Sequence, residues 1–139
     1  INTVIENSNN FPVIFPAHPR TKKTLNTYKR PIENLYEIGP LPYLEFNFLV
    51  KYAKVVITDS GGITEETTIL NIPCLTLRDS TERPETVEMG TNELIGSDEK
   101  GIGPAMKKIF SNKWKKGRIP PLWDGKTSKR IINRILTLK

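Results

Sequence analysis

The sequence predicts an α/β fold, a Rossmann-like parallel sheet with helices on both faces. Short apolar runs alternate along the chain with stretches of helical periodicity, an order that is typical of parallel sheets. The hydrophobic content of 37% and the charged content of 26% are those of a globular protein. The length of 139 residues is sufficient for one domain with a substantial core.

The predicted strands are short, and each ends in a loop rich in turn residues. Five segments have this character: residues 11–15, 35–38, 55–57, 74–77 and 91–95. Pro12 stands at the start of the first segment, where the missing backbone donor does least harm to a sheet.

Helical periodicity predicts the segments between these strands. The first ten residues resemble the last turns of a helix, and further helices are expected at residues 21–28, 43–52, 63–70, 84–89, 99–110 and 128–138. In the helix at 43–52 the spacing places Leu44, Phe48, Leu49 and Tyr52 on the core face and Phe46 elsewhere. In the last helix the spacing places four apolar side chains inward: Ile131, Ile132, Ile135 and Leu138.

The most informative stretch is VVITDSGGITEE at residues 55–66, which predicts a buried strand, a glycine turn and a helix start. Gly61 and Gly62 would let the backbone approach a ligand and adopt unusual φ values. Amide groups at a helix N-terminus favour a phosphate, and Glu66, one turn further, could accept hydrogen bonds from sugar hydroxyls.

A structural interpretation of the same stretch is equally open at this point. The two glycines would then only allow a helix to pack tightly on its strand, and Glu65 and Glu66 would form a solvated helix face. A short glycine motif does not discriminate between these interpretations.

Three other loops follow predicted strands and carry His18, Pro40 with Leu41, and Arg83. Loops at the carboxyl ends of parallel strands converge on one edge of the sheet, where ligands bind. Arg83 could pair with Glu82 or Asp79, or reach a phosphate with its planar fork. The convergence favours a nucleotide site.

Several other chemistries have no motif in the sequence. It contains no P-loop, no GxGxxG, no metal-ligand cluster and no Ser/His/Asp set, so nothing supports hydride transfer, ATP hydrolysis, zinc chemistry or a bound cofactor. The charge of +6 is spread over the chain with few aromatics, which does not favour nucleic acid. No membrane span or signal peptide is visible. The single cysteine, Cys74, is expected to be a small buried residue in a reducing cytoplasm.

Four strings make a resemblance specific: FPAHPRT, TDSGGITEE, RDSTERPE with MGT after it, and WDGKTSKRI. In this order the chain resembles, over essentially its whole length, the C-terminal domain of non-hydrolysing UDP-N-acetylglucosamine 2-epimerases. That resemblance implies one half of a two-domain glycosyltransferase-B architecture. Residues 1–139 would be the UDP-binding domain, without its first strand and without the N-terminal domain.

The resemblance also implies an activity. Family members interconvert UDP-N-acetylglucosamine and UDP-N-acetylmannosamine by eliminating UDP across the C1–C2 bond and adding it back, without a cofactor. The carboxylates for proton transfer lie in the N-terminal domain, so this chain alone is expected to be inactive. The full-length protein is expected to be a cytoplasmic homodimer whose partners are the UDP-sugar and its own N-terminal domain.

Site roles follow from the resemblance by position. The diphosphate would be held by Ser60, Gly61 and Gly62, and Glu66 would take the ribose hydroxyls. Phe46 and the backbone at Leu41 would frame the uracil, although many relatives have Gln at the position of Leu41. Arg83 would support the phosphates. His18 would stand near the reacting sugar, where an imidazolium stabilises developing negative charge.

Three alternatives remain on the sequence alone. A hydrolysing relative would use the same pocket and release N-acetylmannosamine and UDP. A non-catalytic UDP-sugar-binding regulatory domain would bind UDP without turnover. Nucleic-acid binding through the basic surface would fall steeply with salt and would not respond to UDP.

Overall fold

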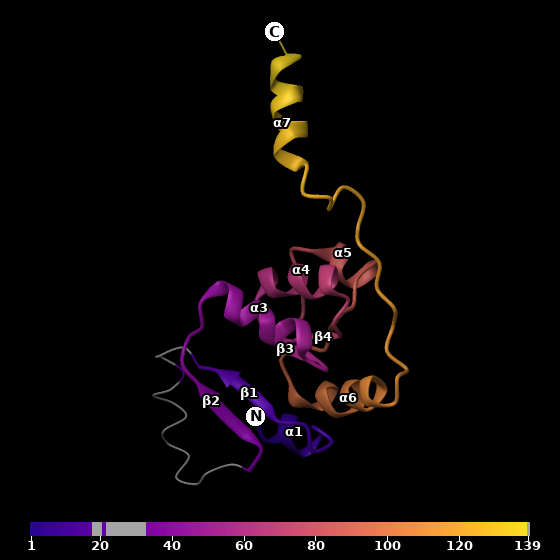
Figure 1. Cartoon of the computed structure of the whole chain (residues 1–139). Coiled ribbons are helices and arrows are strands. Elements are labelled where there is room, and N and C mark those ends of the chain that lie inside the picture. Colours follow the sequence, from indigo (N-terminus) through magenta and orange to yellow (C-terminus); the bar gives the residue numbers. More distant parts are fainter. Residues whose placement is uncertain (18–20, 22–32, 139) are drawn as a thin grey trace.

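The computed structural model describes residues 1–17, 21 and 33–138, and this part of the chain forms the expected α/β fold of parallel strands and helices (Figure 1). The strands are β1 (Val13–Pro16), β2 (Leu35–Ile38), β3 (Val56–Thr58), β4 (Cys74–Thr76) and β5 (Asn92–Leu94). The helices are α1 (Asn2–Glu6), α3 (Tyr43–Tyr52), α4 (Gly61–Leu70), α5 (Pro84–Glu88), the 3-10 turn η1 (Glu99–Gly101), α6 (Ile102–Phe110) and α7 (Thr127–Leu136). The helix predicted at 21–28 lies outside the described residues, apart from Thr21.

The strands form two parallel ladders rather than the one sheet expected. β1 pairs with β2, with Val13 opposite Leu35. β4 lies between β3 and β5, so that Cys74 is opposite both Val56 and Asn92. All three residues of β4 are buried, which makes it the central strand of the larger ladder.

The two faces of the larger ladder are chemically different. Side chains alternate along a strand, so Leu75 points to one face while Cys74 and Thr76 point to the other. Leu75 packs in the apolar core with four residues of α6: Ile102, Ala105, Met106 and Ile109. Figure 1 shows α6 on one side of β3 and β4, and α4 with α5 on the other.

The layer under α4 and α5 is polar. Seven of its side chains are at most 2% exposed: Thr64, Thr67, Thr68, Thr76, Thr86, Thr91 and Asn92. Among the described residues no buried side-chain nitrogen or oxygen lacks a hydrogen-bond partner, so this layer carries no unpaired polar group. Directional hydrogen bonds therefore link these two helices to the strands.

Helix α3 buries a different face from the one predicted. Val50 is buried and Phe46, one turn earlier, is half-buried, whereas Leu44, Phe48 and Tyr52 are 79%, 61% and 68% exposed. Phe46 is not among the residues that form the hydrophobic core or pack against it, so its predicted place off the core face stays a prediction. Apolar residues lie on both sides of this helix, and α3 contacts α4.

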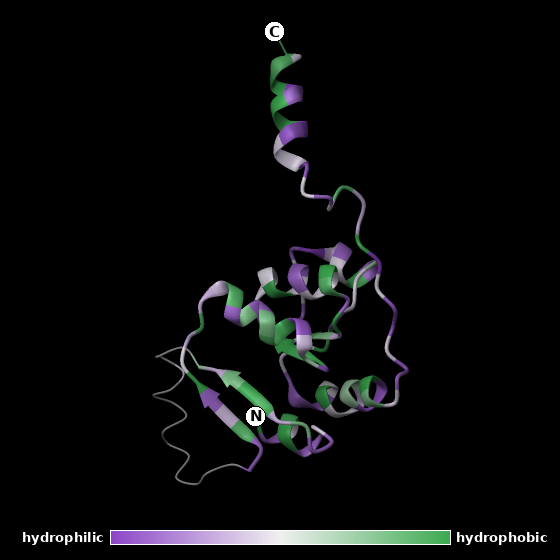
Figure 2. Ribbon diagram, viewed as in Figure 1, coloured by the Kyte–Doolittle hydropathy of each residue, from purple (hydrophilic) through white to green (hydrophobic). Residues whose placement is uncertain are grey.

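The inward face predicted for the last helix is also wrong. Helix α7 extends from the body after a long irregular segment (Figure 1), and its hydrophobic residues are visible along it in Figure 2. Ile131, Ile132 and Ile135 are 54%, 56% and 61% exposed, and Leu138 is 69% exposed. The spacing predicted an amphipathic helix correctly but carried no information about what covers it. Within the described residues no helix has the length and apolar character needed to cross a membrane.

Gly90 allows the close contact between α4 and α5. A Cβ on Gly90 would lie 2.5 Å from the Thr86 carbonyl oxygen, and it would also overlap the Thr68 hydroxyl oxygen. A backbone carbonyl cannot turn away from such a contact as a flexible side chain can. The absence of a side chain at residue 90 is therefore what lets the polar layer close.

We expect Gly90→Ala to lower the free energy of unfolding by about 1–3 kcal/mol, because the added methyl group overpacks a closed contact. Chemical denaturation followed by circular dichroism measures this change. Gly39→Ala is the matched control, since a Cβ at residue 39 would meet no atom within 4 Å. Equal stability of the two variants would contradict the proposed role of Gly90.

Candidate functional site

The first turn of α4 has its amide groups uncapped. β3 ends at Thr58, and the Ser60 amide donates a hydrogen bond of 3.0 Å to the Thr58 hydroxyl oxygen, which fixes the connection to α4. Ser60 is the N-cap residue with extended backbone angles, but its side chain makes no capping hydrogen bond. The amides of this turn and the Ser60 hydroxyl are therefore free to bind an anion, which the helix dipole also favours.

The two glycines serve this turn by leaving space. Helix α4 begins at Gly61, earlier than predicted, and neither Gly61 nor Gly62 has a positive φ, so the expectation of unusual φ values was wrong. A Cβ on either glycine would meet no atom within 4 Å, so tight helix–strand packing does not explain them either. The space in front of the turn is open to a ligand.

Glu66 and Glu65 lie one turn further along α4, and both are half-buried. Glu66 accepts no hydrogen bond from any of the described residues, so its carboxylate keeps its full capacity to accept hydroxyl groups. Glu65 instead binds Arg83. The pair remains solvent-exposed, so the interpretation of Glu65 and Glu66 as a solvated helix face stays open.

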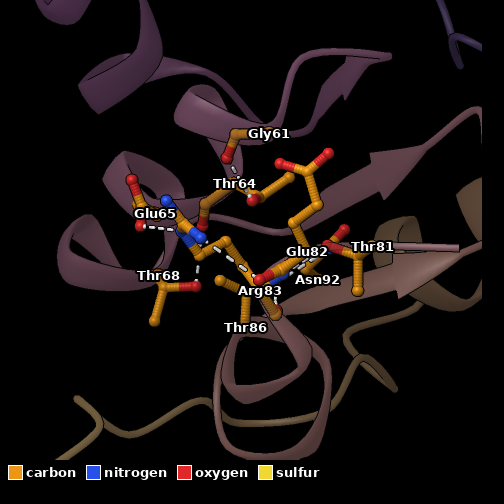
Figure 3. A network of polar contacts seen from close by, with 9 residues as sticks. All are labelled: Gly61, Thr64, Glu65, Thr68, Thr81, Glu82, Arg83, Thr86 and Asn92. Atoms are coloured by element: carbon orange, nitrogen blue, oxygen red, sulfur yellow. Dashed lines mark hydrogen bonds and ion pairs between the residues drawn. The ribbon is translucent and has the colours of Figure 1, made fainter.

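Arg83 reaches the side of α4 from the loop before α5 (Figure 3). Its Nε donates a hydrogen bond of 2.6 Å to Glu65 Oε1, and this contact raises the pKa of Arg83 above its ordinary value. Of the alternatives weighed for Arg83, a structural pair is present, but its partner is Glu65 and not Glu82 or Asp79; toward Glu82, Arg83 Nη1 donates to the backbone carbonyl oxygen, at 3.2 Å.

The Arg83–Glu65 pair orients the guanidinium of Arg83 but does not use all of its hydrogen-bond donors. The side chains are 47% and 37% exposed, and ion pairs at such positions contribute little to stability. Arg83 Nη2 has no partner among the described residues, so one edge of the guanidinium remains available. A positive group thus lies at Glu65, one turn after the open first turn of α4.

The two residues predicted to frame a base do not line the same recess. Leu41 is half-buried and borders an apolar recess between β2 and α3, together with Ile38, Leu44, Glu45, Phe48 and Leu49. Phe46 is on the other side of α3, toward Val50. The described residues therefore place Leu41 and Phe46 on different sides of one helix.

The remaining candidates are outside the structure or chemically inert. His18 lies outside the described residues. Cys74 is fully buried, and this burial raises the pKa of its thiol to about 11, so it stays protonated at neutral pH, as a structural cysteine does. Within the part of the chain that the structure describes, no group of His, Cys, Asp or Glu side chains could hold a metal ion.

Sequence reasoning missed the residues that hold Arg83 in place. Thr86 donates a hydrogen bond of 2.8 Å to the Arg83 carbonyl oxygen, and Asn92 donates one of 3.2 Å to the Thr86 hydroxyl oxygen. Two signals were available in the sequence. Thr86 stands three residues after Arg83, a spacing that permits side-chain-to-backbone bonding, and asparagine is unusual in a buried strand.

Comparison with known proteins identifies the family of the chain. The family described as UDP-N-acetylglucosamine 2-epimerase matches residues 1–136. The UDP-N-acetylglucosamine 2-epimerase of Methanocaldococcus jannaschii is 44% identical over 132 residues, which cover 90% of this chain and 35% of that protein. The enzyme of the same name from Methanococcus maripaludis is 46% identical over 128 residues, which cover 87% of this chain and 34% of that protein. The chain thus spans about 35% of the length of the first of these relatives.

Solved structures with the same fold agree with this assignment. The UDP-GlcNAc 2-epimerase of Methanocaldococcus jannaschii in complex with UDP-GlcNAc and UDP superposes with a TM-score of 0.77 at 39% identity, covering 99% of this chain and 38% of that one. The enzyme of Neisseria meningitidis bound to UDP-GlcNAc superposes with a TM-score of 0.83 at 31% identity, covering 98% and 39%. The predicted fold, one half of a glycosyltransferase-B architecture, is confirmed.

Proposed function

The chain belongs to the UDP-N-acetylglucosamine 2-epimerase family, and from this premise we propose that it supplies the UDP-binding half of an enzyme that interconverts UDP-N-acetylglucosamine and UDP-N-acetylmannosamine. The observation that carries the proposal is the uncapped first turn of α4, with the guanidinium of Arg83 held by Glu65 one turn further along the same helix. Two further facts support it: solved relatives of this fold bind UDP-GlcNAc, and one of them also binds UDP.

Each group at this turn has a defined part in the proposed binding. The Ser60 hydroxyl and the amides of Gly61 and Gly62 donate to the diphosphate, whose charge is favoured by the helix dipole. The free edge of Arg83 contacts the same oxygens. Glu66 accepts hydrogen bonds from the ribose hydroxyls. Leu41 and Phe46 are proposed to approach the uracil from the loop and the helix that follow β2.

In the proposed reaction this chain stabilises the leaving group. Removal of the proton from C2 and cleavage of the bond from C1 to the UDP oxygen give 2-acetamidoglucal and UDP. Protonation of the opposite face of C2 and return of the UDP oxygen to C1 complete the inversion. Donors at the first turn of α4 stabilise the charge that develops on UDP, and His18 is proposed to assist near the sugar.

The groups that move the C2 proton are proposed to lie in a separate N-terminal domain, by the family resemblance.

The division of the strands into two ladders supports a second contribution from outside this chain, a strand of the sheet. In the common doubly wound order the first strand lies between the second and fourth strands, which correspond to β1 and β3 here. We propose that a strand from outside this chain pairs with both. A full-length structure in which β1 and β3 pair directly with each other would refute this.

The quaternary state and the location of the protein are also proposals. We propose a homodimer of the full-length protein, by the family resemblance, and a cytoplasmic location, because the one cysteine is buried and reduced. Sedimentation of the full-length protein and cell fractionation test these two statements.

We expect the 139-residue chain to bind UDP, and Ser60→Ala and Glu66→Ala each to weaken binding by roughly 1–3 kcal/mol, because each removes a hydrogen bond to the nucleotide. Isothermal titration calorimetry measures the change.

The matched controls for this titration are Ser128→Ala and Glu6→Ala, which make the same replacements at exposed positions on α7 and α1. They should leave the UDP affinity unchanged. If the wild-type chain binds no UDP, or if the site and control variants behave alike, the proposed site is wrong.

We expect the isolated chain to convert no UDP-N-acetylglucosamine, since catalysis requires both halves of the site held in register. The full-length protein should yield UDP-N-acetylmannosamine, as determined by NMR of the reaction mixture. Turnover by the isolated chain would contradict the proposal that the groups for proton transfer lie outside it. Free N-acetylmannosamine as the product would indicate a hydrolysing enzyme, and UDP binding without any turnover would indicate a regulatory domain.

A further inference from the structure

A buried chain of hydrogen bonds leads from the centre of the sheet to the backbone of Arg83. The Thr76 hydroxyl on β4 donates to Asn92 Oδ1 at 2.6 Å, and Asn92 Nδ2 on β5 donates to the Thr86 hydroxyl oxygen at 3.2 Å. Thr86 in turn donates to the Arg83 carbonyl oxygen at 2.8 Å. Asn92 and Thr86 have no exposed surface, and Figure 3 shows both next to Arg83.

The donor and the acceptor of each hydrogen bond in this series are fixed by the groups that take part. A carbonyl oxygen can only accept, so the single hydroxyl proton of Thr86 points to Arg83. The oxygen of Thr86 then accepts a hydrogen bond from the side of Asn92, and the amide NH2 supplies it. The amide oxygen of Asn92 is left to accept from Thr76. An asparagine satisfies both neighbours at this position, whereas an ionised aspartate offers acceptors only.

We propose that Asn92 is a positioning residue for Arg83, acting through Thr86, which rests on the proposed role of Arg83 in binding the UDP diphosphate. Arg83 is held at several points. Its amide donates to the Thr81 hydroxyl oxygen at 3.1 Å, its Nη1 donates to the Glu82 carbonyl oxygen, and its own carbonyl oxygen accepts from the Thr86 amide at 3.0 Å as well as from the Thr86 hydroxyl. Glu65 holds its guanidinium at the protein surface, and Thr86 holds its carbonyl in the buried layer. The exposed ion pair is weak. The buried contact therefore fixes the backbone position from which the Arg83 side chain extends, and with it the oxygens of the diphosphate that the guanidinium reaches.

The test compares UDP affinity and thermal stability in a set of variants. Thr86→Val removes the link to Arg83, Thr86→Ser keeps the hydroxyl, and Asn92→Asp turns the donor into an acceptor, so that the Thr86 proton leaves the Arg83 carbonyl. Thr91→Val is the matched control, because Thr91 is equally buried but donates to the Ile72 carbonyl oxygen. Each variant is also made in an Arg83→Ala background.

We expect Thr86→Val and Asn92→Asp to weaken UDP binding roughly two- to tenfold, the range of one lost hydrogen bond. Thr86→Ser should bind like the wild type, and Thr91→Val should lower the melting temperature without changing affinity. In the Arg83→Ala background the effects on affinity should vanish while the losses of stability persist, a result that a purely structural role would not give.

Two results overturn the inference alone: unchanged UDP affinity in Thr86→Val and Asn92→Asp, or a loss of affinity that persists without Arg83. No effect of Arg83→Ala on UDP affinity would overturn the role of Arg83, and the positioning role with it, while UDP binding at the first turn of α4 would stand. No UDP binding by the wild-type chain would overturn the proposed function itself. These failures are therefore distinguished by the same titrations.

Discussion

The hydrogen-bonded contact of α4 and α5 with the strands beneath them is the constraint on which the site depends. The proposed diphosphate donors belong to α4 and Arg83 to the loop before α5, so the distance between these two helices sets the geometry of the candidate site. That distance is set by Gly90, where a Cβ would overlap Thr68 and the Thr86 carbonyl. The polar layer then fixes α5 relative to β4 and β5.

The electrostatic interactions of the candidate site are weak in this chain because its charged groups are exposed to water. Arg83 is half exposed and already shares its charge with Glu65, and exposed charges interact weakly in water. The backbone donors of α4 face open space as well. A second domain that excludes water would strengthen each of these contacts, because the same charges attract more strongly at low dielectric. The chain alone therefore contains the proposed donors, but in water these donors attract an anion less strongly than they would in a site closed to solvent.

The fold and the central turn could be predicted from the sequence because both depend on local patterns. The order of β-branched runs and helical periods predicts parallel strands, and a strand followed by Ser60-Gly61-Gly62 predicts a helix N-terminus. The burial of α3 and α7 could not be predicted, because periodicity shows that a helix is amphipathic and not what lies against it. The partner of Arg83 was missed for a related reason. Glu82 and Asp79 are near in sequence, but α4 brings Glu65 closer in space.

The two faces of the larger ladder contribute differently to the structure: one mainly stabilises the fold, and the other mainly fixes the positions of α4, α5 and their loops. The apolar face under α6 gains stability from area removed from water, a term with no direction, and such cores tolerate repacking when volume is kept. The polar face cannot repack in this way, because each donor must meet its acceptor or leave a buried group unpaired. That face carries α4 and the loop of Arg83. Replacing Thr86 with an apolar residue of similar volume would keep the layer closed, yet it would remove the directional bond to the Arg83 carbonyl. The observed arrangement is the one expected where position matters more than burial.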